Sequence, residues 1–265
     1  MRRVNEVLLY GTLGGAVAAA ATAAGALPVL FGRGFSRRQS DVMLGFSAGV
    51  MLAASFFSLI LPGIEIAQGQ LGARWAAALV AVGGVLLGFA AVAGLNRVLP
   101  HEHFQKGYEG PGGAAEAAAL ARVWLFVIAI AIHNFPEGLS IGVGFGTGNI
   151  VDGVSLTTGI SLQDIPEGLA VAVALIGRSY PPGRAFLIAA LTGLVEVVAA
   201  ALGAAAVSVS AALLPWGLTF AAGAMLYVIS HEIIPETHRG GHEGPATVGL
   251  AIGLSLMMFL DVALG

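Results

Sequence analysis

Two copies of one short phrase stand inside apolar stretches of the chain. They read His-Asn-Phe-Pro-Glu-Gly at 133–138 and Gln-Asp-Ile-Pro-Glu-Gly at 163–168. Each copy places a carboxylate, Glu137 or Glu167, directly after a proline. A charged side chain at the centre of a membrane helix costs about 3 kcal/mol or more, so residues of this kind mark functional sites. The chemistry that suits them is the binding of a cation.

The spacing within each phrase brings its polar side chains onto one helix face. The first residue of a phrase lies four positions before the glutamate and the second lies three before it, and residues at these spacings are neighbours on a helix. Each proline removes a helical hydrogen bond, so we expect both helices to be kinked and the carbonyls of Ile132 and Leu162 to turn toward the site. The predicted cluster holds His133, Asn134, Glu137, Gln163, Asp164 and Glu167.

Glu196 is the only charged residue in the apolar stretch 185–209, and we expect it to complete the cluster. Four buried carboxylates cannot all be charged without partners, and no Lys or Arg lies inside these apolar stretches. A divalent cation, or two, is the natural partner, with protons replacing it when the site is empty. His, Glu and Asp suit zinc and other first-row metals. The alternative is that the phrases only shape two kinked helices whose glutamates are protonated and hydrogen-bonded.

The stretches that carry these residues are long enough to span a bilayer. The chain has 265 residues, of which 57% are hydrophobic and 10% charged, whereas a soluble domain has about 25% charged residues. A net charge of −3 gives no indication of nucleic-acid binding, and the absence of cysteine excludes disulfides and thiolate metal sites. We therefore predict an all-α polytopic membrane protein, a single transmembrane domain over 1–265. Its eight spans are expected at 7–31, 40–63, 74–97, 122–145, 153–177, 185–209, 213–235 and 245–264.

The arrangement of these spans follows from the repeat and from the basic residues. The two phrases are 30 residues apart on consecutive spans that cross in opposite directions, which is an inverted repeat. Nine of the 12 Lys and Arg lie in alternate loops, so we place those loops, including a mobile one at 98–121, in the cytoplasm and both termini outside. Arg2 and Arg3 by themselves favour the opposite orientation. The N-terminal stretch also resembles a signal peptide, whose cleavage would leave a chain starting near Leu27.

The two phrases resemble the fourth- and fifth-helix signatures of the ZIP (ZRT/IRT-like) metal transporters, which usually read HNxPEG and HxxPEG. The resemblance covers essentially the whole chain, including Phe-Ser-Ala-Gly-Val-Met at 46–51 and His-Glu at 231–232, and is strongest to the bacterial GufA-type branch. It implies an eight-helix homodimer in the lipid bilayer of the bacterial inner membrane. It also implies that both termini are periplasmic or extracellular and that zinc or another divalent metal ion moves into the cytoplasm.

The same resemblance implies a site for one or two metal ions, with Glu137 and Glu167 shared between two. Many relatives have histidine at the position of Gln163, so we expect cadmium, iron or manganese to be accepted besides zinc. The bound and transported ion is expected to be Zn²⁺ or Cd²⁺, and no organic cofactor is expected. One ion would take His133, Gln163 and Met51, and the other would take Asn134, Asp164 and Glu196.

Further polar residues lie near the ends of the predicted spans. We expect His231 and Glu232, together with His101 and His103, to form a metal relay on the cytoplasmic side; the alternative is a solvated loop in which histidines happen to cluster. Glu65 and Asp261 end their spans on the outer side, where they either attract cations to an entrance or mark the water boundary. The outcome depends on which of these side chains the fold brings together.

Three functions remain to be compared. The first is a divalent-metal carrier that works by alternating access through a midplane site. A metal-selective channel could use the same ligands, because rate and saturability are not encoded in a motif. An intramembrane metalloenzyme is disfavoured, because the His-Glu pair at 231–232 is followed by Pro235 where a zincin needs histidine, and no glutamate has histidine three residues later. The sequence thus predicts a transporter that is not an enzyme.

Overall fold

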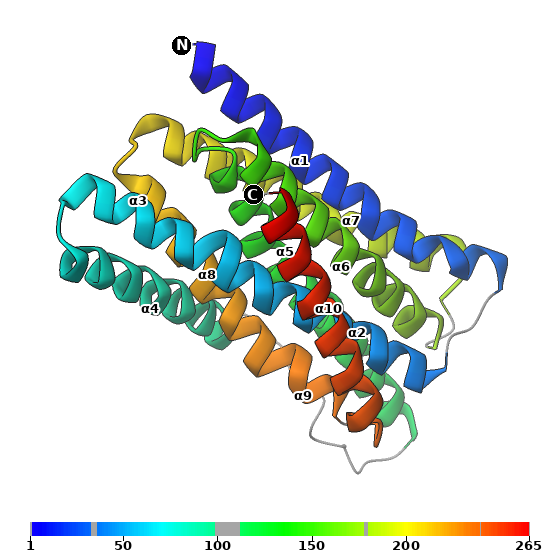
Figure 1. The fold of residues 1–265 in the computed structure, drawn as a ribbon. Helices are drawn as coiled ribbons and strands as arrows, with labels where there is room; N and C mark the ends of the chain where they lie inside the picture. The colour runs from blue at the N-terminus through cyan, green and yellow to red at the C-terminus, as the bar shows by residue number, and fades with distance from the viewer. Residues whose placement is uncertain (1, 33–35, 99–111, 178–179, 239, 265) are drawn as a thin grey trace.

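All regular structure in the described residues is helical (Figure 1). The computed structural model describes residues 2–32, 36–98, 112–177, 180–238 and 240–264. Within these ranges seven helices are long and apolar enough to cross a membrane. The prediction of an all-α, multi-pass membrane protein is therefore confirmed. The seven candidate spans are Val4–Phe31, Arg37–Leu71, Arg74–Gly94, Ile150–Ile176, Pro182–Val209, Leu213–Thr237 and Glu243–Ala263.

The helices follow the predicted order, with two spans interrupted by short segments of wider π-helix. One π-segment, Ala54–Ile60, joins the second and third helices, and another, Ile229–Ile233, joins the eighth and ninth. A 3₁₀ turn, Leu27–Phe31, ends the first span. The α-helices are α1 (Arg2–Ala26), α2 (Arg37–Ala53), α3 (Leu61–Leu71), α4 (Arg74–Val98), α5 (Gly112–Gly144), α6 (Ile150–Ile176), α7 (Pro182–Val209), α8 (Leu213–Val228), α9 (Ile234–Thr237) and α10 (Glu243–Leu264).

Local sequence signals set several of these boundaries. Ser36 and Gln39 form a reciprocal capping box at the start of α2, in which Ser36 Oγ accepts a hydrogen bond from Gln39 N at 3.3 Å. Asn149 caps α6, because its Oδ1 accepts a hydrogen bond from Val151 N at 3.1 Å. Gly72, with φ 70°, ends α3 in the left-handed conformation that glycine adopts without strain.

The structure differs from the sequence prediction between the third and fourth spans. A loop was expected at 98–121, but α5 already begins at Gly112 and continues through the predicted span 122–145. The reason is composition, because Ala-Ala-Glu-Ala-Ala-Ala at 114–119 consists of strong helix formers. Residues 99–111 lie outside the described ranges. The prediction that both phrases lie within helices is confirmed. Pro136 lies inside α5 and Pro166 lies inside α6, and neither helix is interrupted there.

The helices pack closely through small residues. α1 lies along α7 and α6, and α5 lies along α7, whereas α4 pairs with α8 and α10 with α2 (Figure 1). A Cβ atom on Gly49 of α2 would lie 2.0 Å from the Leu250 carbonyl oxygen of α10, so only glycine allows this approach. Small residues of this kind let membrane helices come into backbone contact. The result is a bundle in which α5 and α6, the helices that carry the two phrases, pack against α1 and α7.

Candidate metal centre

Three buried carboxylates from α5 and α6 meet at the centre of this bundle. One oxygen each of Glu137, Asp164 and Glu167 lies within 4.8 Å of the others. None of the three side chains is more than 1% exposed. Because carboxylates this close repel one another when ionised, the arrangement requires protons or a cation. The sequence prediction that the two phrases converge is thus matched by the geometry of these three residues.

The glutamine of the second phrase links the two helices directly. Gln163 is fully buried, and its Nε2 donates a hydrogen bond to Glu137 Oε1. The other end of the same amide, Gln163 Oε1, is buried with no hydrogen-bond partner among the described residues. Gln163 therefore holds Glu137 on one side and offers a neutral oxygen donor on the other.

Glu196 of α7 joins the cluster from a third helix. Its side chain is fully buried and lies beside the Asp164 carboxyl group. Its Oε1 accepts a hydrogen bond from Thr22 Oγ1 of α1 at 3.3 Å. The lone charged residue of the 185–209 stretch is therefore placed where the sequence analysis expected it.

Several oxygens of the cluster are buried without hydrogen-bond partners among the described residues, and each such atom costs about 1–3 kcal/mol if it is left unsatisfied. Carboxylate and amide oxygens are suitable ligands for divalent cations. The donor set therefore fits a divalent ion, since one oxygen each of Glu137, Asp164 and Glu167 lies close enough to the others to share it. The oxygens without partners among the described residues are Asn134 Oδ1, Glu137 Oε2, Gln163 Oε1, Asp164 Oδ2 and Glu196 Oε2.

The glycine that ends each phrase has a packing role. A Cβ atom on Gly138 would lie 2.4 Å from the Glu196 carbonyl oxygen, so glycine lets α5 lie against α7 beside the cluster. A Cβ atom on Gly168 would lie 2.0 Å from the Thr22 carbonyl oxygen, so glycine lets α6 lie against α1. The Pro-Glu-Gly unit thus combines a carboxylate with the close packing that buries it.

Two hydroxyl groups near the cluster were not singled out from the sequence. Thr22 contacts Glu196, as described above, and Ser47 of α2 donates to the Gln163 carbonyl oxygen at 3.1 Å. The Ser47 hydroxyl group is also within hydrogen-bonding reach of the Glu167 carboxyl group. A serine or threonine in an apolar helix usually bonds to its own helix, so these contacts between helices have no signal in the sequence.

Met51, predicted as a ligand, lies one turn after Ser47 on α2. It is fully buried and belongs to the apolar cluster that includes Leu44 and Met257. Its backbone oxygen accepts a hydrogen bond from Ser55 Oγ at 2.8 Å. A role for the Met51 sulfur in metal binding stays a prediction.

The histidine ligands and the expected relay are only partly described. His133 lies in α5, but its side chain is outside the described part of the structure, as are His101 and His103 entirely. His231, in the π-segment Ile229–Ile233, is exposed and its ring centroid lies 4.8 Å from that of Tyr227. Glu232 is partly buried in the same segment. The relay therefore stays a prediction.

The two entrance candidates have different surroundings. Asp261 of α10 accepts hydrogen bonds at Oδ1 from Ser58 at 2.6 Å and from Ser155 at 3.2 Å, and its Oδ2 is buried with no partner among the described residues. Glu65 of α3 is exposed. Asp261, but not Glu65, thus sits in a polar group built from three segments.

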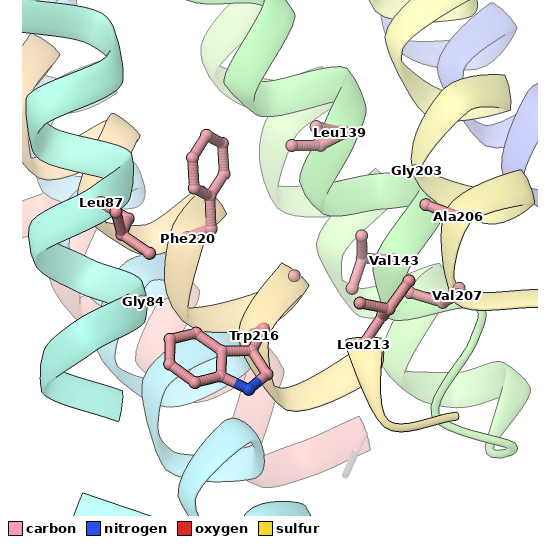
Figure 2. A pocket seen from close by; sticks show the side chains of 11 residues that line it. Gly84, Leu87, Leu139, Val143, Gly203, Ala206, Val207, Leu213, Trp216 and Phe220 are labelled. Atoms are coloured by element: carbon pink, nitrogen blue, oxygen red, sulfur yellow. The ribbon is translucent and has the colours of Figure 1, made fainter. Parts of the chain in front are cut away.

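A pocket lined by apolar side chains lies between helices of the bundle (Figure 2). Its volume is about 240 Å³. Its lining side chains come from α4, α5, α7 and α8 and include Leu87, Val143, Trp216 and Phe220. None of the carboxylates of the cluster lines it. The side chains that line the pocket offer no carboxylate or imidazole to a cation, so this pocket is not a candidate metal site.

Comparisons with known proteins agree with the chemistry of this cluster. A family model described as "ZIP Zinc transporter" matches residues 96–261. The chain is 53% identical over 256 residues to zinc transporter ZIPB of Bordetella bronchiseptica, which covers 97% of this chain and 82% of that protein. It is 47% identical over 255 residues to zinc transporter GufA of Myxococcus xanthus, covering 96% of this chain and 99% of that one. Zinc transporter ZIP11 of Bos taurus is 35% identical over 320 residues, covering 92% and 94%.

Proposed function

Because the chain belongs to the ZIP zinc transporter family, in the branch that includes GufA, we propose that its buried carboxylate cluster is the site through which zinc crosses the membrane. The observation that carries this proposal is the approach of Glu137, Asp164 and Glu167 to within 4.8 Å of one another. The named relatives are zinc transporters, and the donor set fits a divalent ion. The metal is the cargo of this protein and not a resident cofactor.

The site holds two ions that share Glu137 and Glu167. His133, Gln163 and Met51 serve one ion, and Asn134, Asp164 and Glu196 serve the other. The second set is supported by the contact between Asp164 and Glu196 and by the buried oxygens of Asn134, Asp164 and Glu196 that lack hydrogen-bond partners among the described residues. When the ions leave, protons replace them on the carboxylates, because ionised groups this close would repel one another.

The amide at position 163 broadens the choice of metal. A glutamine oxygen is neutral and harder than an imidazole nitrogen, so it favours zinc less strongly over other divalent ions. Gln163 Oε1 is buried with no hydrogen-bond partner among the described residues. The hydrogen bond from Gln163 Nε2 to Glu137 fixes the orientation of the amide and therefore of this oxygen. Iron and manganese are therefore carried as well as zinc, and the loss of strict zinc selectivity admits cadmium too.

The ion moves by alternating access through a homodimer in the bacterial inner membrane, with α5 completing eight spans in each subunit. Asp261, held by Ser58 and Ser155, serves as the outer entrance, since its second oxygen is buried without a partner among the described residues. His231 and Glu232 serve as the cytoplasmic exit, with His101 and His103 contributing from outside the described ranges. Both chain termini lie outside the cytoplasm.

Zinc binding to the purified protein tests the site. We expect the wild type to bind two zinc ions, Glu196→Gln to bind one, and Glu167→Gln to lose both, because Glu167 is shared. Glu6→Gln, an exposed position in α1, is the control and keeps both ions. Zinc binding to Glu137→Gln and Glu167→Gln with wild-type affinity and stoichiometry would refute the proposal.

A further inference from the structure

Thr22 brings a fourth helix, α1, into contact with the metal centre. Its side chain is 1% exposed, and its hydroxyl group lies 3.3 Å from Glu196 Oε1. The same hydroxyl lies 3.3 Å from the carbonyl oxygen of Ala18, one turn earlier in α1. A hydroxyl group has a single proton, so it donates to one of these two acceptors at a time.

The charge on Glu196 decides between the two acceptors. Hydrogen bonds to an ionised carboxylate are about twice as strong as those between neutral groups. The Ala18 carbonyl is a neutral acceptor, whereas Glu196 is ionised whenever it binds a metal ion. The hydroxyl of Thr22 therefore donates to Glu196 in the metal-bound protein.

Packing leaves Thr22 little freedom to move away. On one side, the Gly168 position comes so close to the Thr22 carbonyl that a Cβ atom there would lie 2.0 Å from it. On the other side, a Cβ atom on Gly193 would lie 3.0 Å from both Cβ and Oγ1 of Thr22. Within a helix, threonine is restricted to two χ1 rotamers. The hydroxyl group is thus fixed by α6 and α7 at the position from which it reaches Glu196.

The glycines of the two phrases make corresponding contacts. Gly138 of the first phrase meets the backbone of α7 at Glu196, and Gly168 of the second phrase meets the backbone of α1 at Thr22. Thr22 therefore contacts the second phrase in the same way as Glu196 contacts the first, through the backbone at the glycine that ends the phrase. One of these matched positions carries a carboxylate, and the other carries the hydroxyl group that contacts it.

We propose that Thr22 is a positioning residue of the metal centre, whose hydroxyl group fixes Glu196 Oε1 so that Oε2 binds the ion. The different surroundings of the two carboxylate oxygens of Glu196 support this proposal. Oε1 has Thr22 as its hydrogen-bond partner, whereas Oε2 is buried with no partner among the described residues. Partners of this type orient the ligand and are worth about 10–100-fold in metal affinity. The inference rests on the proposed function, since it assigns a role within the same site.

The test compares zinc affinities of the full-length purified protein, measured by competition with a chelating dye. Thr22→Val removes the hydroxyl group with little change in shape, and we expect it to weaken binding of the ion held by Glu196 by about 10–100-fold. Thr22→Ser keeps the hydroxyl group and is expected to restore most of the affinity. The control is Thr192→Val, since Thr192 is a buried threonine of α7 whose hydroxyl donates to its own helix, at Ala189 O and 2.7 Å. We expect this control to bind zinc like the wild type.

A second comparison separates positioning from packing. In a Glu196→Gln background, Thr22→Val should cause no further loss of affinity, because the carboxylate that it positions is already gone. Wild-type affinity in a folded Thr22→Val protein, or in Thr22→Ala if the valine variant does not fold, would overturn the inference. So would an equal loss in Thr22→Ser and Thr22→Val. If the wild type itself binds no zinc, the proposed function fails and the inference fails with it, whereas the other outcomes overturn the inference alone.

Discussion

Replacement of Gly168 by alanine tests whether the second phrase is packed against α1 as closely as the structure indicates. Gly168 follows Glu167, a ligand in the proposed site, and its Cα faces the backbone of Thr22. A Cβ atom there would lie 2.0 Å from the Thr22 carbonyl oxygen, whereas real contacts of this kind essentially never fall below 3.0 Å. The two helices would therefore have to separate by about the difference between these distances.

The energetic cost can be worked out from this displacement. Overpacking a close-packed interior costs about 1–3 kcal/mol. The opposing atom is a backbone oxygen that cannot swing aside, so the cost lies at the upper end of this range. Alanine gains about 1 kcal/mol over glycine in helix propensity. We expect a net loss of about 2 kcal/mol in the free energy of unfolding. Because Glu167 directly precedes Gly168 in α6, separation of α1 and α6 would also displace the Glu167 carboxylate and lower the zinc affinity.

Reversible unfolding in mixed micelles with increasing dodecyl sulfate, followed by tryptophan fluorescence, measures this free energy. Gly69→Ala in α3 is the matched control, because a Cβ atom there would have no neighbour within 4 Å. The control is expected to gain up to about 1 kcal/mol from helix propensity alone. A Gly168→Ala protein as stable as the wild type, with unchanged zinc affinity, would show that α1 and α6 do not make this contact and would refute the reasoning.

Three further substitutions have defined outcomes. Gln163→His is expected to raise the affinity for zinc relative to manganese in competition assays, since imidazole replaces an amide oxygen; unchanged competition would remove Gln163 from the ligand set. Asp261→Asn should raise KM for zinc uptake while leaving equilibrium binding at the buried centre unchanged, and an unchanged KM would remove Asp261 from the entrance. Ser36→Ala removes the capping box of α2 and should cost about 1 kcal/mol in unfolding experiments; full stability would mean that the cap is not formed.

The buried carboxylates stand out in the sequence because their chemistry conflicts with their surroundings. Glu137, Glu167 and Glu196 are carboxylates in stretches of apolar residues, and lipid-facing structure explains none of them. The repeated phrase then supplied the geometry, because two helices with the same spacing of polar residues had reason to face each other. The structure brings Glu137, Asp164 and Glu167 together, as the spacing within the two phrases predicts.

The hydroxyl groups could not be predicted for the opposite reason. Thr22 and Ser47 are compatible with an apolar helix, because a hydroxyl group there is normally satisfied by a carbonyl of its own helix. Thr192 makes that local bond, whereas Thr22 also reaches Glu196. The difference depends on how closely α1 approaches α6 and α7, which is a property of tertiary packing.

The helix boundaries show where local propensity was underestimated. The segment 112–121 was expected to be part of a loop because the connection 98–121 contains a Gly-, Pro- and Ala-rich stretch, yet its alanines extend α5. The π-segments at Ala54–Ile60 and Ile229–Ile233 were not predicted, since π-helix is rare and each span was taken as regular α-helix. One of them carries Ser58, which contacts Asp261, and the other carries His231.

Zinc uptake into proteoliposomes tests the central claim, that the buried carboxylates are the transport site, most directly. Glu137→Gln and Glu167→Gln keep the volume of each side chain and remove its charge, and Glu6→Gln does the same at an exposed position of α1. We predict saturable uptake by the wild type and by Glu6→Gln, and its loss in both buried variants. Uptake by correctly inserted Glu167→Gln at the wild-type rate would contradict the claim, because zinc would then cross the membrane without the carboxylate that both ions share.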